Sequence, residues 1–318
     1  MAQILVTGGE GFIGSAICRE LLERGENVRV LDLPRPSFAG LSARGILGEV
    51  EMISGDVADG AVTSSAVAGM DRVFHLAAQT LVGPAARDPL GTFRSNVEGT
   101  WRVLEACRVA GPEAVVVASS DKAYGPSTSL PYREDQPLEP AATYEASKAA
   151  TDVIARSYSS AAGVPVAVTR LANVYGGGDL NFSRIVPELM AAAVHGREPR
   201  FRSDGSPRRD FLHVSDAVTA YLILADALAE GRGRGLAVNA GTGIPTSVAD
   251  VIEATGRTTG NEFGKSELAE GPPEGEIDDQ FVDPSRLFDL TGWRARTDLD
   301  TGLREAFEWY RSRPDLCP

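Results

Sequence analysis

The residues of this 318-residue chain that most plainly suggest chemistry are a tyrosine and a lysine four positions apart. Tyr144 and Lys148 fall within an amphipathic stretch that predicts a helix, so their side chains lie on the same helical face. An ammonium group close to a phenol favours the phenolate, and we therefore expect the pKa of Tyr144 to lie below its usual value of about 10. A phenolate there can take a proton from a hydroxyl group undergoing oxidation. Upstream, Ser119 and Ser120 end a predicted strand, where parallel sheets bind ligands.

A glycine-rich segment follows the first predicted strand and opens the first predicted helix. Gly9, Gly11 and Gly14 match the pattern G-x-G-x-x-G, and Gly8 with the last two matches the looser G-x-x-G-x-x-G. Glycine suits such a loop because a pyrophosphate must approach backbone N–H groups at the helix N-terminus, where a Cβ atom would collide. The segment predicts a dinucleotide-binding site.

Two acidic residues follow further extended stretches and extend this prediction. Asp32 ends the second predicted strand, 18 residues after Gly14, where a carboxylate binds the adenosine ribose hydroxyls. A carboxylate there repels a 2′-phosphate, so the pattern favours NAD over NADP. Asp56, followed by Val57, is a candidate for the adenine edge, and a plain loop position is its alternative.

The elements that must position these residues are read from the apolar pattern. Short apolar runs alternate with amphipathic stretches over residues 1–175, which indicates βαβ units. The predicted strands are Ile4–Thr7, Val28–Leu33, Val73–Leu76, Ala114–Ser119 and Val166–Leu171, and the predicted helices include Asn96–Ala110, Tyr144–Ala162 and Thr301–Ser312. We predict an α/β fold with a Rossmann-type doubly wound parallel sheet over residues 1–175. A strand near residues 236–240 returns to this sheet, residues 176–318 form mainly a smaller C-terminal α/β substrate lobe, and residues 271–275 form a loop.

The charge balance, the cysteine spacing and the lengths of the apolar runs exclude several classes of partner and location. Lys and Arg number 31 against 44 Asp and Glu, and this net charge of −13 disfavours nucleic acid and membrane surfaces as partners. The three cysteines are far apart, with no spacing for a metal or a redox pair. We expect no signal peptide, because residues 2–6 form too short an apolar run and lack a basic start, and no membrane span, because apolar runs stay under about 18 residues. We expect a cytoplasmic protein without a metal.

The motifs together resemble the extended short-chain dehydrogenases/reductases of the nucleotide-sugar epimerase/dehydratase type. Over nearly the whole chain they occur in the family's order, as residues 7–14, 74–79, Ser120 with Tyr144 and Lys148, residues 173–176, residues 209–211 with His213, Val214 and Asp216, and residues 292–293. The resemblance implies an NAD-dependent enzyme acting on a nucleotide-diphosphate sugar. It also implies a homodimer formed through the helices containing residues 101–110 and 144–158.

The resemblance assigns roles to single residues. Ser120 would hydrogen-bond the substrate, Tyr144 would act as the base, and Lys148 would bind the nicotinamide ribose. The cofactor would be lined by Phe12, Ile13, Val57, Leu76, Ala77, Ala78 and Asn96, whereas His75 would be structural. Asn173 and Arg209 match positions that contact the nucleotide diphosphate, and Asp179 and Arg184 are expected to face the substrate. Six arginines stand against three acidic residues from Arg184 to Arg209, a local positive excess that suits phosphate recognition.

The two residues after Ser120 bear on the reaction itself. Asp121 and Lys122 resemble the Ser-Asp-Lys of CDP-glucose 4,6-dehydratases, whose Gly-Gly-Gly-Asp segment is also similar to residues 176–179. Asp121 would protonate the departing 6-hydroxyl group, and Lys122 stands where other dehydratases carry the base for the C5 proton. A lysine must first lose its own proton to act in that way. The alternative for the two residues is a surface ion pair beside the site.

We therefore predict an NAD-dependent 4,6-dehydratase that forms a 4-keto-6-deoxy sugar nucleotide. An NAD-dependent 4-epimerase or 2-epimerase using the same Ser120, Tyr144 and Lys148 is the first alternative. CDP-sugar 2-epimerases keep the lysine but have Asn before it, so Asp121 carries most of the distinction. A non-catalytic NAD-sensing protein on the same scaffold is the second alternative.

Overall fold

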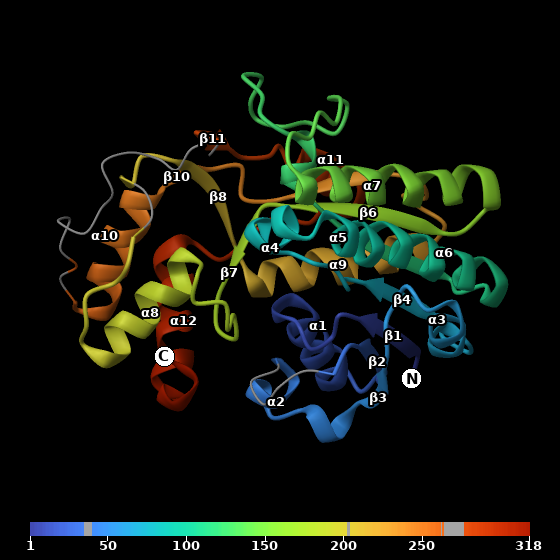
Figure 1. Cartoon of the computed structure of the whole chain (residues 1–318), viewed down its shortest axis with the longest axis horizontal. Helices are drawn as coiled ribbons and strands as arrows, with labels where there is room; N and C mark the ends of the chain where they lie inside the picture. Colours follow the sequence, from blue (N-terminus) through green and yellow to red (C-terminus); the bar gives the residue numbers. More distant parts are fainter. Residues whose placement is uncertain (35–39, 202–203, 262, 264–276) are drawn as a thin grey trace.

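The larger lobe of the protein is built on a seven-stranded parallel sheet (Figure 1). The structure is a computed structural model that describes residues 1–34, 40–201, 204–261, 263 and 277–318. The strand order is β3-β2-β1-β4-β5-β6-β9, and every neighbouring pair is parallel. The strands are β1 (Gln3–Thr7), β2 (Asn27–Asp32), β3 (Glu51–Ser54), β4 (Arg72–His75), β5 (Ala114–Ser120), β6 (Val166–Leu171) and β9 (Ala237–Ala240). This arrangement confirms the predicted Rossmann-type fold.

Alternate residues of the strands pack into two hydrophobic cores, one on each face of the sheet. Val116 in β5 belongs to the core that includes residues of α1 (Phe12–Glu23) and α9 (Val214–Ala229). Its neighbours Val115 and Val117 belong to the other core, with residues of α3 (Gly60–Val67), α6 (Gly99–Ala110) and α7 (Thr143–Ala162). Strands buried on both faces read as continuous apolar runs, which explains why the sequence revealed them.

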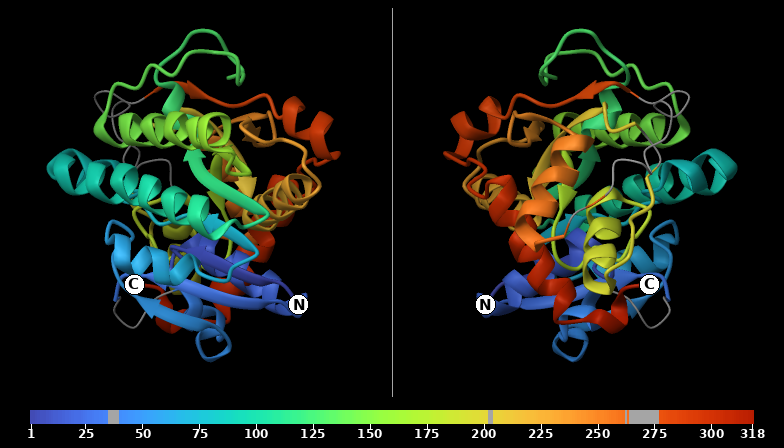
Figure 2. Two further views of the ribbon diagram at one scale, coloured as in Figure 1. Left: turned by 90° about the vertical axis from the view of Figure 1, so that its right-hand side faces the viewer. Right: turned by 90° about the vertical axis from the view of Figure 1, so that its left-hand side faces the viewer.

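The smaller lobe is built on a second sheet that begins where β6 ends. β7 (Asn173–Tyr175) follows β6 after a single residue and pairs with β8 (Arg208–His213). β8 also pairs with β10 (Pro245–Ser247) and β11 (Asp279–Gln280). The helices α8 (Ile185–His195), α10 (Val248–Thr259) and α12 (Leu299–Arg311) pack on one another, as the right-hand view of Figure 2 shows. The chain thus leaves the main sheet after Leu171 and enters the smaller lobe at Asn173.

Several elements were not expected from the sequence. These are the helices α3, α8, α9 and α10, the strands of the second sheet, the short helices α2 (Gly40–Arg44), α4 (Val82–Arg87), α5 (Pro89–Phe93) and α11 (Ser285–Thr291), and the 3₁₀ turns η1 (Leu47–Glu49), η3 (Asp121–Tyr124) and η5 (Pro314–Leu316). The helix predicted over residues 96–110 begins with a π-helical turn, η2 (Arg94–Glu98), and continues as the α-helix α6 from Gly99. The loop predicted at residues 271–275 lies outside the described residues. No helix among the described residues is long and apolar enough to cross a membrane.

Candidate active site

A cavity of about 940 Å³ opens at the carboxyl ends of the main strands, as expected for ligand sites in such sheets. Segments following β1, β2, β3, β4, β5 and β6 line it, together with residues of the smaller lobe. The predicted site residues in its wall are Gly8, Gly11, Phe12, Ile13, Gly14, Asp32, Asp56, Val57, Leu76, Ala77, Ala78, Ser120, Lys122, Tyr144, Lys148, Asn173, Asp179, Arg184 and Arg209. Asn96 and Asp121 are not in the wall, and both are 1% exposed.

The glycine-rich loop is fixed by its own packing. A Cβ atom on Gly14 would overlap the carbonyl oxygen of Gly8, and a Cβ atom on Gly8 would lie 2.7 Å from the backbone nitrogen of Ala77. Gly8 also has a φ of +74°, which favours glycine. At these two positions the packing of the protein itself already requires glycine, apart from any clearance that a pyrophosphate needs.

Gly11 is the position that leaves space for a ligand. A Cβ atom there would meet a single protein atom within 4 Å, the Gly8 carbonyl oxygen at 3.1 Å. Gly11 lines the cavity and immediately precedes α1, which carries no side-chain cap and no acidic residue in its first turn. The positive end of the α1 dipole therefore lies at the cavity wall, and this cradle fits the pyrophosphate of NAD.

Asp32 stands at the end of β2 in the cavity wall. Its carboxylate accepts hydrogen bonds from the backbone nitrogens of Glu10 at 2.9 Å and Leu33 at 2.8 Å. These bonds join the end of β2 to the glycine-rich loop, so Asp32 also holds the loop in place. Asp56, farther along the wall, forms an ion pair with Arg94 at 3.4 Å. The described charged residues at this end of the wall are the carboxylates Glu10, Asp32 and Asp56.

Tyr144 and Lys148 project from the first turns of α7, where β5 ends. Burial raises the pKa of Tyr144 to about 12, with the Ser120 hydroxyl and the Arg184 guanidinium acting in the opposite direction. The expectation that Lys148 lowers the pKa of Tyr144 is wrong, because the Lys148 ammonium donates instead to the carbonyl oxygen of Ala118 at 2.8 Å. Burial lowers the pKa of Lys148 to about 8. The free protein thus holds a neutral phenol beside a buried amine.

Asp121 lies behind Ser120, out of contact with the cavity. Its Oδ1 atom accepts a hydrogen bond from the Ser120 hydroxyl at 3.0 Å, and its Oδ2 atom has no hydrogen-bond partner among the described residues. Burial raises the pKa of Asp121 to about 6. The alternative of a surface ion pair with Lys122 is wrong, because Asp121 is buried and Lys122 Nζ donates to Gln280 Oε1 at 3.2 Å.

Asn96 and His75 support the site from behind. Asn96 accepts from the backbone nitrogen of Gln79 at 2.6 Å and donates to the Gln79 carbonyl at 3.0 Å, so it positions the cavity-lining segment after β4 rather than lining the cavity itself. His75 lies between the hydroxyls of Thr7 and Thr100, at 2.7 and 3.1 Å. Burial lowers the pKa of His75 to about 3, so it is a neutral packing residue.

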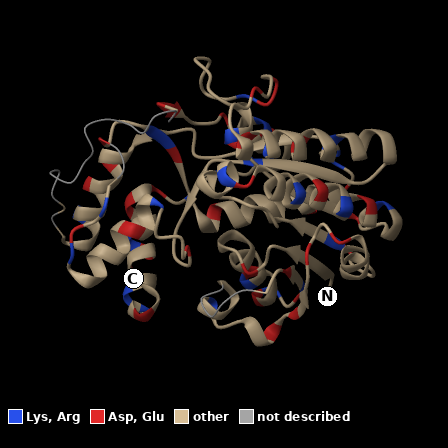
Figure 3. Cartoon of the chain, viewed as in Figure 1, with Lys and Arg blue, Asp and Glu red and all other residues tan. Residues whose placement is uncertain are grey.

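The predicted substrate residues lie in the lobe half of the cavity. Arg184 forms an ion pair with the buried carboxylate of Asp179 at 2.9 Å. Arg209 lines the wall from β8, which carries adjacent basic and acidic residues (Figure 3). Two other arginines of the predicted basic stretch are paired elsewhere, Arg197 with Glu188 and Arg208 with Asp279. The stretch is therefore not one basic patch, and among its described arginines only Arg184 and Arg209 reach the cavity.

Sequence reasoning missed two features of this site. Gln280 reaches Lys122 from a two-residue strand that carries no periodic signal. The chain also holds only three lysines among its 31 basic residues, at positions 122, 148 and 265. Arginine thus supplies the ordinary surface cations, and two of the three lysines line the cavity. An amine can lose its proton where a guanidinium cannot. The scarcity of lysine could therefore have marked Lys122 and Lys148 as candidates for proton transfer.

Fold and site together define a class of protein. The glycine-rich loop and the carboxylate of Asp32 line one part of the cavity, and a hydroxyl, a phenol and an amine line another. This is the arrangement of an enzyme that uses a nicotinamide dinucleotide to oxidise a hydroxyl group.

Comparison with known proteins gives the family. Residues 4–241 match the model of the NAD dependent epimerase/dehydratase family. A dTDP-glucose 4,6-dehydratase of Mycolicibacterium smegmatis is 29% identical over 317 residues, covering 98% of this chain and 93% of the relative. A UDP-glucose 4-epimerase of the same organism is 32% identical over 318 residues, covering 97% and 98%. The solved structure of a dTDP-glucose 4,6-dehydratase double mutant from Streptomyces venezuelae with NAD bound superposes with a TM-score of 0.86 at 27% identity, covering 98% of each chain. The chain belongs to the NAD dependent epimerase/dehydratase family and is an NAD-dependent enzyme.

Proposed function

We propose that the enzyme is a nucleotide-sugar 4,6-dehydratase, which converts a nucleotide-diphosphate hexose into a 4-keto-6-deoxy sugar nucleotide. Relatives at about 30% identity carry the names of nucleotide-sugar 4,6-dehydratases and 4-epimerases, which supports the substrate class but not the choice between the two reactions. The substrate diphosphate would meet Arg209 and Arg184, the described arginines in the cavity wall.

The chain's own residues divide the proton transfers between them. Tyr144, next to Ser120, would take the proton of the 4-hydroxyl group. NAD, held at the glycine-rich loop and Asp32, would supply the redox chemistry, which is hydride removal at C4 and hydride return at C6. Lys122, as a neutral amine, would remove the C5 proton, which the 4-keto group has made acidic. Asp121 would protonate the 6-hydroxyl group, which leaves as water, and the C5 position then recovers a proton.

The observation that carries this proposal is the state of Asp121. A general acid must hold a proton near the working pH, and an aspartate carboxyl group with its usual pKa of 3.8 does not. Burial raises the pKa of Asp121 to about 6, and this carboxyl group is hydrogen-bonded to Ser120 beside Tyr144. A 4-epimerase needs no such group, since it only returns hydride to the other face of C4.

One observation favours a second candidate, the 4-epimerase. Asp121 is 1% exposed and is separated from the cavity wall by Ser120. An acid for the 6-hydroxyl group must come within hydrogen-bond reach of it, either directly or through one water. In this reading Asp121 only orients Ser120, and turnover requires no elimination.

Incubation with a panel of nucleotide hexoses, followed by mass spectrometry in H₂O and D₂O, tests the two candidates. A dehydratase product is lighter by the mass of one water and carries deuterium at C5 when formed in D₂O. An epimerisation product keeps its mass, takes up no solvent deuterium, and has a new configuration at C4. The second result with every turned-over hexose would replace the dehydratase by the epimerase.

We also infer a homodimer formed through the outer faces of α6 and α7. Trp101 is 40% exposed and Val109 74% exposed on α6, and Val153 is 53% exposed on α7. Exposed apolar side chains on adjacent helices are typical of an interface between subunits. Analytical ultracentrifugation at micromolar concentration would show a dimer that Val153→Glu dissociates. A wild-type monomer at that concentration would contradict the inference.

A further inference from the structure

Gln280 brings the far end of the chain to the reaction centre. Its side chain is fully buried in β11, at the position that pairs with Arg209 of β8. Its Oε1 atom accepts the hydrogen bond from Lys122 Nζ, whereas its Nε2 atom has no hydrogen-bond partner among the described residues. A buried amide with one half unpartnered is costly, so its presence calls for an explanation.

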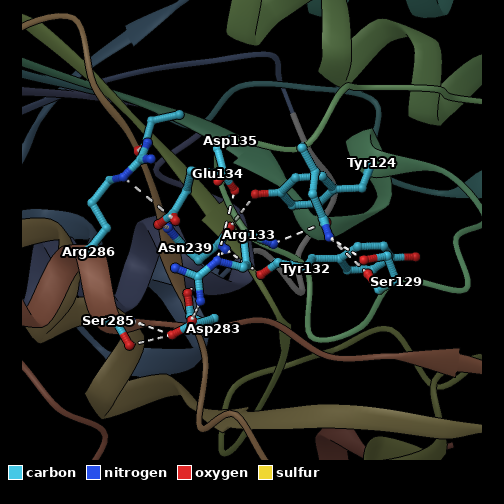
Figure 4. Close-up of polar contacts among 12 residues, drawn as sticks. Tyr124, Ser129, Tyr132, Arg133, Glu134, Asp135, Asn239, Asp283, Ser285 and Arg286 are labelled. Atoms are coloured by element: carbon cyan, nitrogen blue, oxygen red, sulfur yellow. Dashed lines mark hydrogen bonds and ion pairs between the residues drawn. The ribbon is translucent and has the colours of Figure 1, made fainter.

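The segment that follows Gln280 is fixed independently of Lys122. Tyr132 donates from its backbone nitrogen to the Phe281 carbonyl at 2.9 Å and accepts from the Asp283 backbone nitrogen at 2.9 Å. Arg133 forms an ion pair with Asp283 at 2.6 Å, and Asn239 in β9 donates to the Asp283 carbonyl at 3.2 Å. Figure 4 shows these side chains converging from the loop after η3, the main sheet and the segment 283–286. These contacts hold the residues after Gln280 against other segments, so Gln280 can serve as a reference point for the Lys122 amine.

Lys122 needs such a reference. Among the described residues it makes no ion pair, and its side chain lies in the cavity wall on the turn η3. A lysine side chain has four rotatable bonds, and a misplacement of about 1 Å from a reacting atom costs a large factor in rate. A neutral amide oxygen orients the amine without the negative charge of a carboxylate, which would favour the ammonium form.

We propose that Gln280 is a positioning residue that holds the Lys122 amine at the cavity wall for removal of the C5 proton. This inference rests on the proposed function, because the C5 proton is removed only in the dehydration. Gln280 is not in the cavity wall, so it acts through Lys122.

Rapid quenching with borodeuteride tests the kinetic part, because it traps a 4-keto hexose formed before water is lost. We expect Gln280→Leu to slow elimination by roughly 10-fold to 100-fold and to accumulate this 4-keto hexose, with KM unchanged. In a Lys122→Met background the same substitution should have no further effect on elimination. Gln136→Leu is the control, because its amide bonds Ser129 of the exposed loop.

A merely structural role would lower the melting temperature and leave the ratio of trapped 4-keto hexose to dehydrated product at the wild-type value. That ratio unchanged in Gln280→Leu would overturn the proposal, as would additive effects with Lys122→Met.

The contact itself can be checked without any turnover. With ¹³Cε-labelled lysine the protein should give three NMR signals, and the Lys122→Met variant assigns the one from Lys122. Gln280→Leu should shift the Lys122 signal and leave the Lys148 signal in place. An unshifted Lys122 signal would overturn the positioning role, whatever reaction the wild type performs. A shifted signal in a protein that removes no water from any hexose would support the contact and reject only the dehydratase.

Discussion

The Ser120 hydroxyl donates a 3.0 Å hydrogen bond to Oδ1 of Asp121, so the cavity wall and the buried carboxyl group behind it are directly linked. Ser120 also caps the turn η3 by accepting from the Lys122 backbone nitrogen at 3.2 Å. One serine thus fixes the orientation of both residues on which the choice between dehydration and epimerisation depends.

Asp121→Asn and Tyr144→Phe should have different effects on the reaction. Tyr144→Phe removes the group that takes the 4-hydroxyl proton, so neither a trapped 4-keto hexose nor product should form. Asp121→Asn leaves that step intact but lacks the proton for the leaving group, so elimination should slow by roughly 10²–10⁴-fold while the 4-keto hexose accumulates. Borodeuteride trapping and mass spectrometry measure both quantities. Normal turnover of Asp121→Asn without solvent deuterium in the product would favour the epimerase.

The burial of Asp121 also predicts a pH-dependent stability. Its pKa in the folded protein, about 6, lies above the usual 3.8, so the folded state binds the proton more tightly than the unfolded state. That contribution is complete below pH 3.8 and is lost as the pH rises through about 6. Relative to wild type, Asp121→Asn should therefore gain up to about 3 kcal/mol of unfolding free energy between pH 4 and pH 8.

Urea denaturation at several pH values measures this difference. Asp135→Asn is the control, because its side chain is 73% exposed. An Asp121→Asn difference that stays constant with pH would show that the carboxyl group does not titrate in this range.

Removal of NAD should raise the pKa of Tyr144. In the free protein burial dominates and raises that pKa to about 12. The nicotinamide ring carries a positive charge, and a positive charge near a phenol favours its ionised form, by roughly one to three pKa units at close range. Tyrosinate absorbance, taken as wild type minus Tyr144→Phe, measures the titration with and without NAD. Identical titrations in the two states would mean that the cofactor charge does not reach this phenol.

Gly14→Ala should disrupt the cofactor cradle. The added Cβ atom would overlap the Gly8 carbonyl oxygen, and the strain should cost about 1–3 kcal/mol of unfolding free energy and release NAD. Gly48→Ala is the matched control, because nothing lies within 4 Å of its Cβ position and its φ is not positive. Thermal melting and the NAD content after gel filtration give the two readouts. Retention of NAD by Gly14→Ala at the wild-type level would contradict this account of the loop.

The sequence by itself determined the fold class and which strand and helix ends meet at the cavity. Buried parallel strands read as apolar runs, and the strand and helix ends then place Gly14, Asp32, Ser120 and Tyr144 at one edge of the sheet. Such local patterns can be read without three-dimensional information, because the period of the side chains follows from the backbone geometry.

Tertiary structure alone decided the chemistry of these groups. A pKa depends on burial and on neighbours from distant segments, so the sequence could not show that burial outweighs the Tyr144–Lys148 spacing, or that Asp121 is enclosed. Nor could it bring Gln280 to Lys122 across 158 positions, because the two-residue strand β11 gains its place only by pairing with β8. Contacts of this kind follow from the packing of the whole chain, and no local pattern records them.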